Sequence, residues 1–189
     1  ELCKKFGAIL IFDEIQTCYG RTGKLFGFQK YKIAPDIICI AKGMGGGMPI
    51  GCFISSNKIM SKLREKPILG HITTFGGHPI NCAASLKTLE ILLKTKLISE
   101  INSKEKLFRN LLNHERIKKI NGTGLMLGVE FENEMLCDKV IKNCRKNGLL
   151  TFYFLFEKKS MRISPPLTIT KKEIQKSCQI IIKSINECL

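Results

Sequence analysis

The chain has 189 residues, of which 44% are hydrophobic and 25% are charged, proportions typical of a globular protein rather than a disordered tail. The longest apolar run, Leu149 to Phe156 interrupted by Thr151, is far shorter than the roughly 20 residues that span a bilayer. The formal net charge is +15, yet no run of five consecutive basic residues occurs. This spread of lysines favours a basic solvated surface over a nucleic-acid or membrane partner.

The nine cysteines point to a reducing compartment. Their count is odd, they are scattered singly, and no Cys-x-x-Cys pair occurs, so neither a disulfide framework nor a metal site is predicted. The first residues show no secretory signal, because no apolar stretch and small-residue cleavage site follow them. We therefore expect a cytoplasmic protein.

Residues 1–94 read as part of an α/β domain. Three short apolar runs, Ala8 to Phe12, Ile37 to Ala41 and Ile50 to Ile54, are bounded by glycine and proline and predict strands buried on both faces. Such strands favour a largely parallel sheet. Pro79 then opens a predicted helix whose apolar face continues to Leu93.

Residues 95–189 change to helices alternating with single strands, which predicts a small α+β domain. The last helix begins with a capping box formed by Thr170 and Glu173. In chain order the expected elements are a helix carrying Ile98 to Leu112, a strand at Leu125 to Phe131, a helix ending at Asn147-Gly148, strands at Leu149 to Phe156 and Met161 to Ile163, and the final helix carrying Ile174 to Ile185.

Charged residues follow two of the predicted strands. Asp13 comes after the first strand and Lys42 after the second, and open α/β sheets bind ligands at the carboxyl ends of their strands. A lysine beside a buried strand is partly desolvated, which lowers its pKa and favours a role as nucleophile or Schiff-base former. The alternative is an ordinary surface lysine at a strand end.

Two further segments carry glycine and hydroxyl groups. Gly43 to Gly51 lacks the spacing of a nucleotide-binding loop, and the simplest interpretation of this segment is a tight turn. His71 to Pro79 places hydroxyls and backbone amides before a helix, which suits an anion or phosphate, although a polar capping loop has the same composition. No Gly-x-Ser-x-Gly or His-Glu-x-x-His motif supports a hydrolase.

Taken together, these segments resemble the class III pyridoxal-phosphate aminotransferases. The resemblance extends from Glu1 to the end of the chain and looks closest to acetylornithine and ornithine aminotransferases. It implies the C-terminal part of the large, mainly parallel α/β domain of fold type I, followed by a small α+β domain. The motifs that carry it are Phe12 to Thr17, Gly20 to Gly23, Pro35 to Ile37, Ala41 to Gly51, Thr73 to Gly77 and Met161 to Leu167.

The resemblance implies a role for each of five residues. Lys42 is similar to the lysine that binds pyridoxal 5'-phosphate covalently and moves a proton during catalysis. Asp13 resembles the carboxylate that pairs with the pyridine nitrogen, and Gln16 the partner of the phenolic oxygen. Thr74 resembles a phosphate ligand donated across a dimer interface, and Arg162 the guanidinium that clamps a substrate carboxylate.

The implied activity is transfer of an amino group from an acetylornithine- or ornithine-like donor to 2-oxoglutarate by a homodimer, in amino-acid biosynthesis and arginine biosynthesis in particular. A succinyl-diaminopimelate transaminase, a racemase or mutase of the same fold, and a non-catalytic basic binding module are the alternatives. Cys18 and His78 depart from the family, which more often has Gly and Asn there.

The family's chain also continues upstream of Glu1. That part supplies a glycine-rich phosphate loop, an aromatic residue stacked on the cofactor and another arginine. We therefore expect residues 1–189 alone to bind the cofactor poorly and to be inactive, and a partner that supplies the N-terminal part to restore binding.

Overall fold

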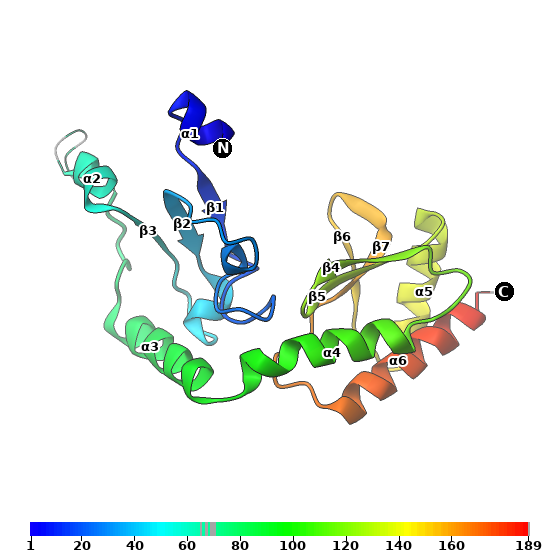
Figure 1. Ribbon diagram of the computed structural model, residues 1–189. Helices are drawn as coiled ribbons and strands as arrows, with labels where there is room; N and C mark the ends of the chain where they lie inside the picture. The colour runs from blue at the N-terminus through cyan, green and yellow to red at the C-terminus, as the bar shows by residue number, and fades with distance from the viewer. Residues whose placement is uncertain (65, 67, 69–70, 189) are drawn as a thin grey trace. The chain divides into compact units, whose positions relative to one another are not determined.

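The computed structural model describes residues 1–64, 66, 68 and 71–188 (Figure 1). The chain divides into two compact units, Glu1–Ile98 and Ser99–Leu189. Among the described residues, no helix is both long enough and apolar enough to cross a membrane.

The first unit is built on a three-stranded sheet of order β1-β2-β3, with β1 at Ile11–Asp13, β2 at Ile37–Ile40 and β3 at Cys52–Ser55. β1 and β2 are parallel, whereas β2 and β3 are antiparallel, so the sheet is mixed. The other elements are α1 (Leu2–Phe6), η1 (Gly27–Lys30), η2 (Lys42–Gly45), α2 (Asn57–Met60), η3 (Ser61–Leu63) and α3 (Pro79–Lys94).

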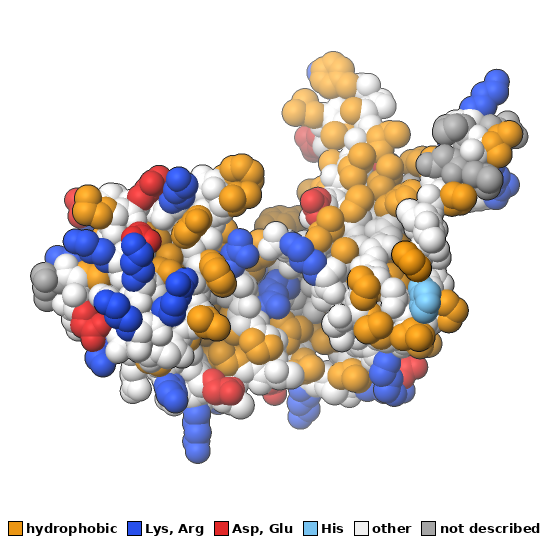
Figure 2. All heavy atoms as spheres, turned by 180° about the vertical axis from the view of Figure 1, so that it is seen from behind, with side chains coloured by type: hydrophobic (Ala, Val, Ile, Leu, Met, Phe, Trp, Pro, Cys, Tyr) orange, Lys and Arg blue, Asp and Glu red, His pale blue; other side chains and the backbone are white. Residues whose placement is uncertain are grey.

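The composition of these strands predicted burial on both faces, and this prediction is wrong for residues 1–98. Ile11 and Ile54 are 56% and 49% exposed, and Ile9 just before β1 is 56% exposed. Figure 2 shows hydrophobic side chains gathered on the part of the chain that carries α1 and β1. Residues 1–98 therefore contain apolar strands without enough helices to cover them.

Helix α3 begins at Pro79, as predicted, and packs against η2. The two elements approach so closely at Gly46 that a Cβ there would lie 2.1 Å from Oγ1 of Thr88. Gly46 has a φ of +58°, which glycine adopts without strain. The side-chain amide of Asn81 donates to the carbonyl of Pro49 at 2.7 Å and ties the same helix to the loop after η2.

The second unit contains an antiparallel sheet of order β4-β5-β7-β6 with helices α5 and α6 packed on it. Its core consists of fully buried apolar side chains from the sheet and the helices, among them Ile101, Phe108, Leu127, Met161 and Ile174. The elements are α4 (Leu97–Leu111), β4 (Lys119–Thr123), β5 (Met126–Glu130), α5 (Glu134–Lys146), β6 (Phe152–Phe154), β7 (Glu157–Ile163) and α6 (Lys171–Asn186).

Several boundaries in this unit are those predicted. Helix α5 ends before Asn147-Gly148, where Gly148 has a φ of +85°, and the capping box of Thr170 and Glu173 opens α6. Strand β4 was not predicted, because Lys119 to Thr123 contains only one apolar residue. The predicted strand at Leu149 to Phe156 is reduced to β6, because the chain turns at Leu155 and Phe156 to form the hairpin with β7.

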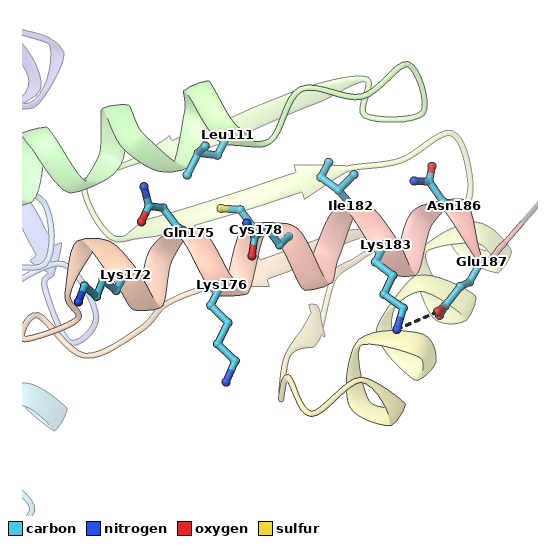
Figure 3. A pocket seen from close by; sticks show the side chains of 10 residues that line it. Leu111, Lys172, Gln175, Lys176, Cys178, Ile182, Lys183, Asn186 and Glu187 are labelled. Atoms are coloured by element: carbon cyan, nitrogen blue, oxygen red, sulfur yellow. Dashed lines mark ion pairs between the residues drawn. The ribbon is translucent and has the colours of Figure 1, made fainter.

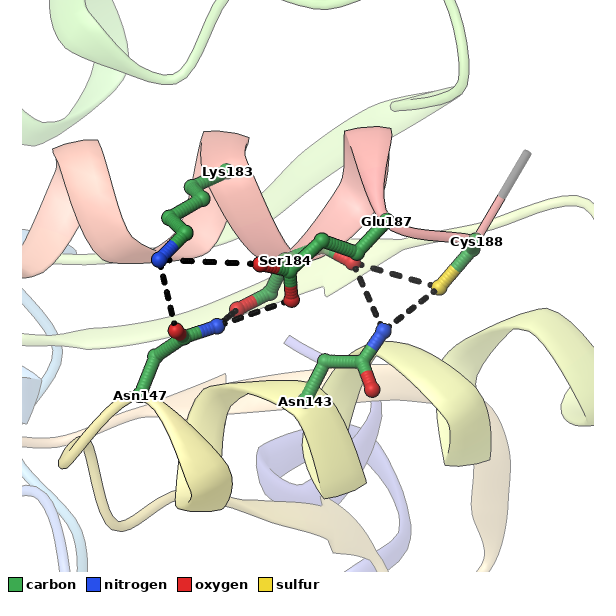
Figure 4. Close-up of polar contacts among 6 residues, drawn as sticks. All are labelled: Asn143, Asn147, Lys183, Ser184, Glu187 and Cys188. Atoms are coloured by element: carbon green, nitrogen blue, oxygen red, sulfur yellow. Dashed lines mark hydrogen bonds and ion pairs between the residues drawn. The ribbon is translucent and has the colours of Figure 1, made fainter.

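A polar network joins the C-terminal ends of α5 and α6 (Figure 4). The amide of Asn147 donates to Oγ of Ser184 at 3.2 Å and to Glu187 at 2.9 Å, and its oxygen accepts from Lys183 at 3.0 Å. Asn143 donates to the carbonyl of Ser184 at 3.3 Å. Ser184 is fully buried, so these bonds satisfy polar groups inside the helix pair.

Candidate active site

Asp13 and Lys42 lie at the same end of the first unit's sheet. Asp13 is the last residue of β1 and pairs with Cys39 of the parallel strand β2. Lys42 follows β2 two residues after its last residue, Ile40. Parallel pairing brings the carboxyl ends of both strands to one edge, so an acidic and a basic side chain start from adjacent strand ends.

Lys42 has a strained backbone. Its φ is +44°, a left-handed conformation that costs a residue with a side chain roughly 1–2 kcal/mol. The side chain is exposed in residues 1–189, so the partial desolvation predicted from the sequence is not present in this chain. Strain of this kind persists where the surrounding structure holds it in place, and it concentrates at functional sites.

Glu14, next to Asp13, has a different environment. It is 3% exposed, and its carboxylate accepts the amides of Gly27 at 2.8 Å and Phe28 at 2.6 Å and the hydroxyl of Thr17 at 2.5 Å. These bonds join the end of β1 to η1 and fix the intervening loop. No role for Glu14 was predicted from the sequence; its position next to Asp13 after an apolar run was the available signal.

Gln16 and Thr74 lie in turns. Gln16 is exposed three residues after Asp13, in the loop that Glu14 fixes. Asp13 itself is exposed, and its Oδ1 accepts the amide of Ile15 at 3.0 Å, which holds the carboxylate at the start of that loop. Thr74 is exposed in the turn before α3, and no bond in the described residues joins it to Lys42.

Two residues mark the departures from the family pattern. Cys18 is 5% exposed, and burial raises the pKa of its thiol to about 11. His78 precedes α3 without a side-chain capping bond. Neither residue belongs to β1 or β2, the strands at whose carboxyl ends Asp13 and Lys42 lie.

Arg162 lies in the second unit, in the middle of the sheet. It is half-buried on β7, and its Nε is buried without a hydrogen-bond partner among the described residues. Its guanidinium carbon is 5.0 Å from the centre of the Phe154 ring. Arg162 also lines a cavity of about 280 Å³ together with Thr151, Phe152 and Ser164.

A wider groove of about 920 Å³ lies over α6 (Figure 3). Leu111, Cys178 and Ile182 line it together with Lys172 and other polar residues of α6, and none of the predicted site residues does. The described residues contain no group of three or more His, Cys, Asp or Glu side chains placed to hold a metal ion.

The chain is similar to proteins of known family and structure. Residues 1–185 match the model of the class-III aminotransferase family. An aminotransferase from Bacillus anthracis is 30% identical, with a TM-score of 0.90 over 98% of this chain and 46% of that one. Ornithine aminotransferase from Toxoplasma gondii is 32% identical, with a TM-score of 0.88 over 97% of this chain and 44% of that one.

Ornithine delta-aminotransferase from Plasmodium falciparum is 30% identical, with a TM-score of 0.88 over 98% of this chain and 48% of that one. The chain therefore spans less than half the length of these three relatives. The match covers both units and includes the strand ends of Asp13 and Lys42 as well as Arg162 on β7. The chain belongs to the class-III aminotransferase family.

Proposed function

We propose that this chain supplies the part of the active site that contains the cofactor-binding lysine in a pyridoxal-phosphate-dependent aminotransferase. The observation that carries the proposal is the placement of Asp13 and Lys42 at neighbouring ends of two parallel strands. Pyridoxal phosphate is the cofactor of class III aminotransferases, and a Toxoplasma gondii relative is described with the cofactor at partial occupancy in its active site. When bound, the cofactor supplies an electron sink for a carbanion at the substrate carbon that carries the amino group.

The residues fit this group by their chemistry. Lys42 offers a primary amine on a backbone held in a strained conformation, suited to bind the cofactor and then to move a proton at its Nζ. Asp13 offers an acceptor-only carboxylate to hold a proton on a ring nitrogen. Gln16, on the loop that Glu14 fixes, offers an amide donor for the phenolic oxygen. Thr74 offers a hydroxyl for the phosphate across a dimer interface.

Arg162 is proposed as the clamp for a substrate carboxylate. A planar guanidinium binds a carboxylate through two parallel hydrogen bonds, and the buried Nε of Arg162 has a donor still unused among the described residues. The finer proposal is a homodimeric, cytoplasmic enzyme that transfers an amino group from an ornithine-like or N-acetylated donor to 2-oxoglutarate. Its support is the similarity to ornithine aminotransferases.

Cofactor attachment tests the proposal directly. The complete enzyme is incubated with pyridoxal phosphate, treated with borohydride to make the lysine–cofactor link permanent, and mapped by peptide mass spectrometry. We expect the label on Lys42 and its loss in Lys42→Ala. Lys32 is a matched control, because it is also an exposed lysine with a positive φ, here +54°. A label on Lys32 or any other lysine, with Lys42 unmodified, contradicts the assignment.

A further inference from the structure

Three neighbouring strands of the second unit place Gly128, Phe154 and Arg162 together. Arg162 of β7 pairs with Gly128 of β5, and directly opposed residues of antiparallel strands project from the same face of the sheet. Phe154 ends β6, the strand on the other side of β7.

The Phe154 ring fills the space above Gly128. A Cβ on Gly128 would lie 2.9 Å from Cε2 of Phe154, closer than Cβ atoms approach other atoms in proteins, and 3.5 Å from its Cζ, an ordinary contact distance. Glycine at 128 therefore provides the room in which the ring lies. The same ring has the Arg162 guanidinium 5.0 Å from its centre, within the range of a cation–π contact.

The aromatic contact differs in kind from an ion pair. Among the described residues, no carboxylate forms an ion pair with Arg162. An aromatic face can orient a guanidinium plane without accepting a hydrogen bond from its N–H groups. A carboxylate neighbour would instead compete with a substrate carboxylate for those donors.

We infer that Phe154, seated on Gly128, is a positioning residue that holds Arg162 ready for the substrate carboxylate. The inference rests on the clamp role proposed for Arg162. Phe154 would thereby contribute to substrate affinity, and Gly128 would provide the space that its ring occupies.

The kinetic test compares Phe154→Leu, Phe154→Tyr and Arg162→Lys in the complete enzyme. Phe154→Leu should raise KM for 2-oxoglutarate by about 3- to 30-fold, from the usual strength of a cation–π contact, with kcat changed less than twofold. Phe154→Tyr keeps the aromatic face, so its KM for 2-oxoglutarate should equal that of the wild type. Phe156→Leu is the control, because Phe156 belongs to the same hairpin and is 96% exposed. Cofactor binding should be the same in all four variants.

The Arg162 Nε–H signal in the NMR spectrum of the 189-residue chain gives a second readout that needs no activity. The ring should shift the proton upfield in the wild type and in Phe154→Tyr, and the shift should disappear in Phe154→Leu. Where the Leu variant does not fold, Phe154→Met fills a similar volume without a π face and takes its place.

The outcomes separate the two proposals. If Arg162→Lys leaves KM for 2-oxoglutarate at the wild-type value, the clamp role itself is wrong. If Arg162→Lys raises KM but Phe154→Leu changes neither KM nor the Nε–H shift, the positioning role of Phe154 is overturned while the clamp stands.

Discussion

Replacing Gly46 by alanine tests the contact between η2 and α3 with a matched control in the same unit. Gly46 and Gly7 have nearly the same backbone conformation, with φ of +58° and +65°. They differ in their surroundings: a Cβ on Gly7 would meet nothing within 4 Å, whereas a Cβ on Gly46 would lie 2.1 Å from Oγ1 and 3.4 Å from Cβ of Thr88. The pair of variants therefore separates backbone strain from steric overlap.

The expected losses follow from these two terms. A non-glycine residue in the left-handed region costs roughly 1–2 kcal/mol, which is the whole effect expected for Gly7→Ala. Gly46→Ala adds overlap with the helix, and forcing extra atoms into a packed contact costs roughly 1–3 kcal/mol more. The free energy of unfolding should therefore fall by about 2–5 kcal/mol in Gly46→Ala.

Urea unfolding followed by circular dichroism measures both losses. The double variant Gly46→Ala/Thr88→Ala removes the hydroxyl that the new methyl group meets, so it should recover much of the difference. Because Gly46 caps the turn that begins at Lys42, the single variant should also reduce cofactor labelling of Lys42. Equal losses in Gly7→Ala and Gly46→Ala, without rescue by Thr88→Ala, would refute the reasoning.

Two further predictions concern buried groups. Glu14→Gln replaces one acceptor oxygen by an NH₂ donor, which would face the amides that Glu14 now accepts. We expect the free energy of unfolding to fall by roughly 2–3 kcal/mol and hydrogen exchange at the amides of Gly27 and Phe28 to become faster. Unchanged exchange at these two amides would show that Glu14 does not hold the loop. Burial raises the pKa of the Cys137 and Cys178 thiols from 9.0 to about 12, so these groups keep their protons in the folded chain and lose them on unfolding above pH 9. Their contribution to stability is complete below pH 9 and is lost as pH rises toward 12, by roughly 1.4 kcal/mol per thiol at pH 10. Urea unfolding between pH 8 and 10.5 checks this, with Cys137→Ala as the comparison; a stability that does not fall with pH would contradict it.

Local patterns predicted the elements that depend on local chemistry. Pro79 starts α3, Thr170 and Glu173 cap α6, and Gly148 lies just beyond the end of α5, because each of these residues acts on the backbone within one turn. The placement of Asp13 and Lys42 at strand ends was also predicted from the sequence, since both directly follow apolar runs that form parallel strands, and their roles stay predictions.

Features that depend on distant residues could not be predicted in this way. The antiparallel pairing of β3 with β2, the fit of Gly46 against Thr88, and the position of Phe154 over Gly128 join residues from separate elements. A strand composition predicts burial but does not supply the covering layers, which explains why Ile11 and Ile54 are exposed in residues 1–98. The buried contacts of Glu14 were missed for the same reason, because Gly27 is 13 residues away along the chain.

The left-handed backbone at Lys42 has a consequence for protein engineering. A redesign of this chain that optimised folding stability alone would place glycine at position 42, because the backbone there favours glycine and the lysine side chain is exposed. Such a sequence would keep the turn and the strand ends and lose the amine. Methods that rank substitutions by stability would therefore count the proposed catalytic residue as an error to be corrected, and position 42 has to be held fixed in any such procedure.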